Sequence, residues 1–225
     1  MGHPSRRRLT REQSQEQTRR RLIESARRQV ATRGFNAATV RDIAEDAGYS
    51  LGAFYSNFDS KESLLLEVLS LHRSEEALRV ASIIDSAGGD FSKVLAGIET
   101  WAEQLSKTPK HAMLALELQL QAVRDPNFGA AYSAAMAKQL ALYADLARRL
   151  FDLSGATPPA PLEDIASGLM ALSHGVSLDR ALGVGTGSSV LPVFFRALFQ
   201  KHPAGHARAA KPVARIEPPQ HRRSS

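Results

Sequence analysis

The fold is decided by one stretch near the N-terminus, TVRDIAEDAGYSLGAFYSNFDSKESLL at residues 39–65. Thr39, Ser50 and Ser60 each precede apolar residues at helical spacing, and a hydroxyl at such a position accepts a hydrogen bond from the first turn of a helix. Gly48 separates the first two runs, where a residue that adopts positive φ at little cost allows a tight turn. The stretch predicts a helix-turn-helix, whose second helix enters the major groove of DNA, although a pair of short core helices has the same spacing.

The remaining chain also has apolar residues at helical spacing, and no segment alternates as a strand does. Hydrophobic residues make up 43% and charged residues 23% of the chain, close to the averages of globular proteins. An all-α fold with about nine helices is therefore expected. The predicted helices lie at about residues 15–33, 40–47, 51–57, 61–84, 91–106, 110–124, 126–153, 162–183 and 189–201.

The net charge of +6 is distributed unevenly along the chain. Residues 1–33 hold ten basic and three acidic side chains and residues 201–225 hold six and one, whereas residues 34–200 are acidic on balance. A basic segment beside a helix-turn-helix predicts long-range attraction to DNA. The end of the chain, rich in proline and basic residues, is expected to be disordered.

With Gly34 and Phe35 upstream, the stretch closely resembles the DNA-binding domain of the tetracycline-repressor (TetR) family of bacterial regulators. The resemblance covers about residues 18–69, and the rest of the chain resembles the family only in its length and number of helices. It implies a basic arm (1–14), a helix-turn-helix domain (15–62), a ligand-binding and dimerisation domain (63–201) and a basic tail (202–225). It also implies a homodimeric, ligand-responsive repressor on a palindromic double-stranded operator, with a small-molecule inducer.

Carried over residue by residue, the family pattern places the DNA contacts on the two short helices and on the start of the following one. The expected contacts are Thr39, Arg41, Ser50, Leu51, Gly52, Ala53, Tyr55, Ser56, Asn57 and Lys61. The second helix offers no arginine or lysine for reading guanine. We therefore expect Arg41, Ser56 or Asn57, together with apolar contact to thymine methyl groups, to carry the base readout.

The resemblance further implies an inducer pocket within residues 63–153 and a dimer interface on the last two helices. Apolar candidates for the pocket are Trp101, Leu105, Met113, Leu116, Phe128, Tyr132 and Met136. Candidates for the interface are Leu172, Val176, Leu191, Phe194, Phe195 and Leu198. The expected ligand is largely apolar or aromatic, and its binding is expected to change the angle of the helix that begins near residue 61.

No enzyme, cofactor or metal site is predicted. The chain has no cysteine, which excludes disulfides and thiolate chemistry, and its apolar runs are too short for a membrane span, so a cytoplasmic, nucleoid-associated protein is expected. His72 with Glu75 and Glu76 is interpreted as a solvated helix face rather than an ion site. Two alternatives remain open: an activator or nucleoid-organising protein on the same scaffold, and a ligand-binding helical protein that has lost DNA binding.

Overall fold

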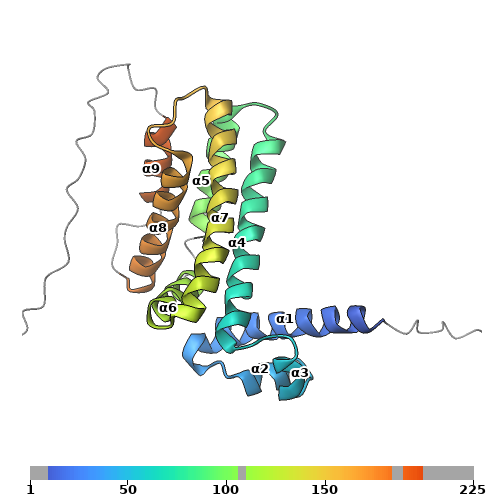
Figure 1. Ribbon diagram of the computed structural model, residues 1–225. Coiled ribbons are helices and arrows are strands. Elements are labelled where there is room, and N and C mark those ends of the chain that lie inside the picture. The colour runs from blue at the N-terminus through green and yellow to red at the C-terminus, as the bar shows by residue number, and fades with distance from the viewer. Residues whose placement is uncertain (1–9, 106–109, 184–189, 200–225) are drawn as a thin grey trace, which may run out of the picture.

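The computed structural model describes residues 10–105, 110–183 and 190–199, and within these ranges every regular element is an α-helix (Figure 1). Both the all-α fold and the number of helices are confirmed. The helices are α1 (Arg11–Ala37), α2 (Val40–Asp46), α3 (Leu51–Tyr55), α4 (Lys61–Ser86), α5 (Phe91–Leu105), α6 (Lys110–Arg124), α7 (Pro126–Ser154), α8 (Leu162–Ala181) and α9 (Val190–Phe199).

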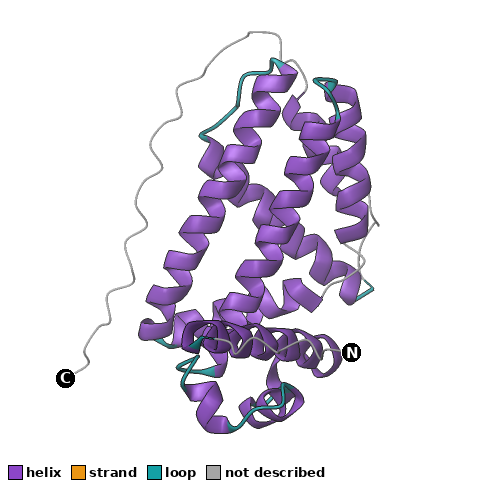
Figure 2. Cartoon of the chain, turned by 90° about the vertical axis from the view of Figure 1, so that its right-hand side faces the viewer, coloured by secondary structure: helices purple, strands orange, loops and turns teal. Residues whose placement is uncertain are grey.

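The helices form two parts that share α4. In Figure 1, α1 lies across the lower end of the molecule, with α2 and α3 below it, while α4 and α7 rise side by side from this base. Helices α8 and α9 pack on the far side of α7 from α4, and α6 lies low, where it contacts α1, α4 and α7. Turned by 90°, the upright helices stand over α1 (Figure 2).

The first helix is longer than the sequence predicts. It begins at Arg11 because Thr10 caps it: the Thr10 hydroxyl accepts from the Gln13 N–H, and the Gln13 side chain accepts from the Thr10 N–H. Four residues assigned to the arm, 11–14, are therefore helical, while residues 1–9 of the arm and all of the tail lie outside the described residues. Gly34 interrupts the helix at φ +82°, where its end was predicted, and a further turn runs to Ala37.

The caps predicted for the next three helices are all present. The Thr39 hydroxyl accepts from the Asp42 N–H at 3.1 Å, and the Ser50 hydroxyl accepts from the Ala53 N–H at 3.2 Å. Ser60 and Ser63 form a reciprocal capping box at the start of α4, with bonds of 3.0 and 3.1 Å. These bonds satisfy N–H groups that a helix end leaves without partners.

Two clusters of buried apolar residues hold the helices together. The first joins α1, α2, α3, the beginning of α4 and the middle of α6, with Leu22, Ile43 and Phe54 fully buried. The second joins the later turns of α4 to α5 and α7. Because α4 supplies Leu64 to the first cluster and Val80 to the second, it is a structural member of both parts.

The two glycines of the helix-turn-helix are predicted to differ in their effect on stability. Gly48 has φ +78°, so Gly48→Ala forces a side chain into the left-handed region and should lower the free energy of unfolding by about 1 to 2 kcal/mol. Gly52 is helical, and an added Cβ would meet only the Ser50 hydroxyl oxygen, at 3.7 Å, so Gly52→Ala should raise stability by up to about 1 kcal/mol. Urea denaturation followed by circular dichroism measures both, and equal losses would contradict the assigned turn.

Candidate nucleic-acid interface and ligand cavity

The second helix of the motif is fixed to the protein by one face and leaves the other open. Phe54 is fully buried and Phe58 nearly so, and the two rings pack with centroids 5.9 Å apart. On the opposite side Leu51 is 39% and Tyr55 58% exposed. A helix held in this way presents its outer side chains to a partner without loosening its own core.

Three of the predicted DNA contacts already use their polar groups within the chain. The Asn57 amide nitrogen donates to the Ala53 carbonyl at 2.8 Å, and its Oδ1 is buried without a partner. The Ser56 hydroxyl donates to the Gly52 carbonyl at 2.8 Å, and the Thr39 hydroxyl donates to the Asp42 carboxylate, also at 2.8 Å. These side chains would have to exchange internal bonds for contacts with DNA.

The two basic residues predicted to contact DNA differ in their surroundings. Arg41 is exposed on the first turn of α2 and has no polar partner among the described residues. Lys61 is only half-exposed: its Nζ donates to the Phe35 carbonyl at 3.1 Å and lies 4.4 Å from the centre of the Phe35 ring. Lys61 thus ties the start of α4 to the end of α1, while Arg41 keeps all its donors available.

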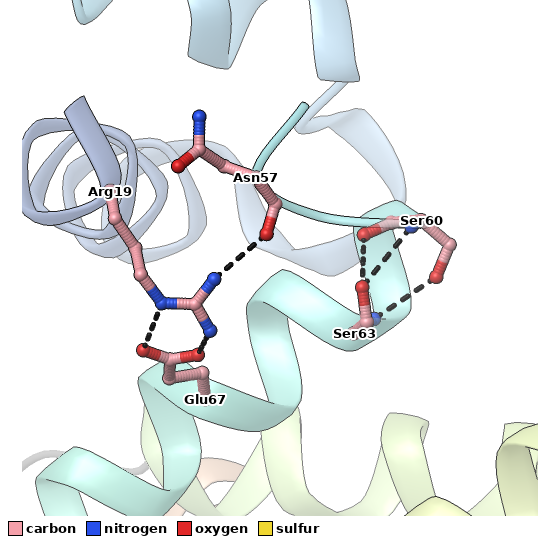
Figure 3. Close-up of polar contacts among 5 residues, drawn as sticks. All are labelled: Arg19, Asn57, Ser60, Ser63 and Glu67. Carbon is pink, nitrogen blue, oxygen red and sulfur yellow. Dashed lines mark hydrogen bonds and ion pairs between the residues drawn. The ribbon is translucent and has the colours of Figure 1, made fainter. Parts of the chain in front are cut away.

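Arg19 holds the end of the motif in place from α1 (Figure 3). Its Nη1 donates to the Asn57 carbonyl at 2.7 Å, and its Nε and Nη2 form a two-pronged ion pair with the Glu67 carboxylate on α4. The guanidinium also lies 4.2 Å from the centre of the Phe58 ring. One side chain therefore fixes the relative positions of α1, the end of α3 and α4.

The C-terminal part encloses a mainly apolar cavity of about 150 Å³. Helix α4 contributes His72, Glu76 and Val80, which lie one turn apart, together with Arg73, and the other walls come from α5, α6, α7, α8 and α9. A second cavity of about 560 Å³ adjoins the first, because Arg73, Met170 and His174 line both.

Two histidines stack at the wall nearest to α1. The rings of His72 and His111 lie 3.5 Å apart between centres with planes 12° apart. Burial lowers the pKa of His72 to about 3, and the charges of Arg27 and of His111 itself act in the same direction. Burial also lowers the pKa of His111. Both rings are neutral at neutral pH, in contrast to the predicted solvated face: only Glu75 of that group is exposed, and Glu76 is buried.

The residues proposed from sequence for the pocket are distributed over several places. Trp101 lines the first cavity, and Leu116, Tyr132 and Met136 line the second. Phe128 packs against the first apolar cluster, and Met113 is half-exposed. The side chain of Leu105 lies outside the described residues. Sequence reasoning missed polar cavity residues on α4, α6 and α8, such as His72, His111 and His174, and also apolar ones such as Leu69, Val80 and Leu146. The spacing of His72 and Arg73 from Leu69, three and four residues along α4, was a signal available in the sequence.

The residues proposed for the dimer interface also separate into two groups. Leu191 is buried within the chain and lines the first cavity together with Phe195. Phe194 is 53% exposed, and Leu172, Val176 and Leu198 are partly exposed. Val193 on α9 and Leu182, which directly follows α8, add apolar surface at 59% and 67% exposure. A partner would therefore meet Phe194 and Val193 rather than Leu191.

Residues 22–68, which form the helix-turn-helix and the first turns of α4, match the family model for bacterial regulatory proteins of the tetR family. This segment is therefore similar to the helix-turn-helix domain of the TetR family. Its members are regulatory proteins, in agreement with the expectation that this chain is not an enzyme.

Curated transcriptional regulators match part of the chain. The transcriptional repressor AcnR of Corynebacterium diphtheriae is 31% identical over 112 residues, which are 49% of this chain and 53% of the relative. The transcriptional regulator TtgR of Pseudomonas putida is 43% identical over 76 residues, 33% of this chain and 36% of the relative. The chain thus spans about half or less of these relatives' lengths.

Solved structures of TetR-family proteins share the whole fold. A putative regulator from Rhodococcus sp. has a TM-score of 0.66 at 18% identity, covering 82% of this chain and 99% of that one. FadR of Thermus thermophilus, in complex with lauroyl-CoA, has a TM-score of 0.61 at 22% identity, covering 86% and 99%. A putative regulator from Saccharomonospora viridis, in complex with choline, has a TM-score of 0.55 at 21% identity, covering 81% and 95%.

Two features of the described part of the chain bear on other functions. None of its helices is long and apolar enough to cross a membrane. No group of three or more histidine, aspartate or glutamate side chains is arranged to hold a metal ion within residues 10–105, 110–183 and 190–199. The stacked histidines are therefore best understood as part of the cavity wall.

Arg41 and Lys61 are predicted to contribute differently to DNA binding. Arg41→Ala should lower affinity for a selected operator by about 10- to 100-fold and relax its sequence preference, because a freely exposed guanidinium reads base edges. Lys61→Ala should weaken all duplexes alike. Fluorescence anisotropy with operator and random DNA measures both. Arg148→Ala, at the far end of α7, is the control, and equal losses on both DNAs for Arg41→Ala would contradict its role as a base reader.

Acid is predicted to destabilise the C-terminal part of the chain through the stacked histidines His72 and His111. Both have a lowered pKa when folded, so the unfolded chain binds protons that the folded chain refuses. Above pH 6.5, the ordinary histidine pKa, the two rings do not lower the free energy of unfolding. As the pH falls from 6.5 toward 3, this free energy decreases because the unfolded chain takes up protons. Replacing both by glutamine should flatten the dependence of unfolding free energy on pH between 7 and 5, where carboxylates stay ionised. The unfolding free energy is measured by urea denaturation at each pH. A variant whose unfolding free energy changes with pH as steeply as that of the parent chain would contradict this assignment.

Proposed function

We propose that this chain is a ligand-responsive transcriptional repressor that binds a palindromic operator as a homodimer. The observation that carries the proposal is the anchored α3, whose buried Phe54 leaves Leu51 and Tyr55 facing outward beside the unpaired Arg41. A helix of this kind fits the major groove, and the repressors among the curated relatives favour the repressor role.

The shared helix α4 supports ligand response. It spans 26 residues, about 39 Å at the rise of an α-helix, and runs from the helix-turn-helix to the cavity wall. Arg27 of α1 forms an ion pair with Glu75 of α4 at 2.7 Å, which adds a second tie between the two parts. A ligand that prefers a different angle of α4 would therefore change the placement of α3 and release DNA.

The apolar surface of α8 and α9 supports a homodimer. Leu182, Val193 and Phe194 are each more than half exposed, although large apolar side chains are usually covered. A two-fold pair formed through these helices would place two α3 helices about 34 Å apart, one turn of DNA, and so would select a palindrome. The complex with DNA would be cytoplasmic and nucleoid-associated.

Two other functions have distinguishable outcomes. An activator or nucleoid-organising protein on this scaffold would occupy sites that do not overlap a promoter, or many dispersed sites. A ligand-binding protein that had lost DNA binding would show no duplex binding at low salt, where contacts with phosphates are strongest. Selection of operators from fragmented genomic DNA separates all three.

A substitution that disrupts the proposed dimer interface is predicted to weaken operator binding as well. Phe194→Glu places a charge in the proposed interface and should give a monomer with at least about tenfold weaker operator binding. Val123→Glu, at an 81% exposed position on α6, is the matched control and should remain dimeric. Light scattering and anisotropy measure the two properties. A dimer that survives Phe194→Glu, or a selected site without two-fold symmetry, would contradict the proposed assembly.

A further inference from the structure

The cavity contains a buried cation that no acidic side chain neutralises. Arg73 is 6% exposed, and among the described residues no carboxylate lies within ion-pair distance of its guanidinium. Its guanidinium donates to the Met136 sulfur and contacts Nε2 of His174 at 3.2 Å, and the Tyr132 side chain is a further hydrogen-bond partner. None of the three partners is a carboxylate, and the guanidinium can only donate. A buried charge of this kind is costly unless an anion meets it.

The neighbouring acid in the cavity is, by contrast, already neutralised. The Glu76 carboxylate accepts from Trp101 Nε1 at 2.6 Å and pairs with Arg79 at 3.2 Å. The charge left without a partner inside the cavity is therefore positive. Burial lowers the pKa of His174 to about 4, with the Arg73 charge as a second cause, so this neighbour adds no positive charge at neutral pH.

The remaining walls favour an apolar molecule. Leu69, Val80, Leu146, Leu150 and Phe195 surround the first cavity, and Arg73 stands where it meets the second. A ligand that places a small anion on Arg73 can thus extend an apolar body along either cavity. Choline, the ligand of the neighbour from Saccharomonospora viridis, is a cation. In this cavity Glu76 is already paired, so its carboxylate does not favour a cationic ligand.

We propose that Arg73 is the anchor for the carboxylate of an amphiphilic small molecule whose apolar body fills the adjoining cavities. The proposal deepens the ligand response proposed above and rests on that function for its regulatory meaning. The carboxylate replaces the thioether and imidazole acceptors with two charge-assisted hydrogen bonds. Because Arg73 lies on α4 and its present contacts lie on α7 and α8, this exchange changes what holds α4 against the rest of the domain.

The test uses the full chain and the fluorescence of Trp101, which is the only tryptophan and lines the cavity. Octanoate, decanoate and 3-phenylpropanoate are titrated at neutral pH beside the alcohols of the same skeletons, and choline serves as a cationic probe. At least one carboxylate should bind about 10- to 100-fold more tightly than its alcohol, the range expected for hydrogen bonds to a charged group. Equal affinity for acid and alcohol, preference for choline, or no saturable carboxylate binding would overturn the proposal.

Variants at position 73 separate anchoring from folding. Arg73→Met should remove the preference for the acid and leave alcohol binding unchanged, Arg73→Lys should retain part of the preference, and Arg148→Met should behave as the parent chain. Alcohol binding by Arg73→Met shows that its cavity is intact. A full preference for the acid in Arg73→Met would contradict the assigned anchor.

DNA binding is measured separately from ligand binding, so that a failure of the proposed repressor function can be distinguished from a failure of the proposed Arg73 anchor. The operator affinity of Arg73→Met is first measured without a probe, and adding the carboxylate should then leave that affinity unchanged, whereas it should lower the operator affinity of the parent chain. A parent chain that binds the carboxylate and no duplex would contradict the proposed repressor and leave the anchor standing. A parent chain that binds the operator but shows no preference for the acid would contradict the anchor alone.

Discussion

The Arg19 guanidinium joins its own helix α1 to two other elements. It donates to the Asn57 carbonyl just after α3 and pairs with the Glu67 carboxylate on α4. The motif is thereby attached to α4 at the point where the Ser60–Ser63 capping box begins that helix. Since an α-helix resists bending over its length, movement at the cavity end is carried to the motif as a change of angle. The proposed ligand response would depend on this attachment.

Ion pairs within the chain also use part of the positive charge of the basic N-terminal segment. Arg28 and Arg33 of α1 pair with Asp46 and Asp42 of α2, at 2.8 and 3.4 Å, so part of the positive charge offsets the acidic short helices instead of facing a partner. Such exposed pairs contribute little to stability. These pairs neutralise charges on the surface beside Arg41, which itself stays unpaired among the described residues. Lys61 is in turn engaged by its bond to the Phe35 carbonyl.

Local chemistry explains why the helices could be predicted from sequence and the cavity could not. Thr39, Ser50, Ser60 and Gly48 act on the residues next to them, so each predicted cap and turn appears at its predicted position. Burial depends on which helices meet in space. His72 and Glu76 read as a solvated face because nothing in the sequence indicates that α6 brings His111, and α5 brings Trp101, against that side of α4. Thr10 was missed because its cap lies within a basic, polar segment.

Helix α6 provides a second connection between cavity and motif that does not pass through α4. His111 lines the cavity and stacks on His72, while Leu114 and Leu118, one and two turns later, belong to the apolar cluster that holds α1 and α3. The Lys110 ammonium also donates to the Ala31 carbonyl on α1. A ligand that moved α4 alone would have to break the histidine stack, whereas one that moved α4 and α6 together would keep it. The second movement would keep this contact and would shift α1 and α3 as one body, and in the proposed dimer such a displacement would separate the two recognition helices.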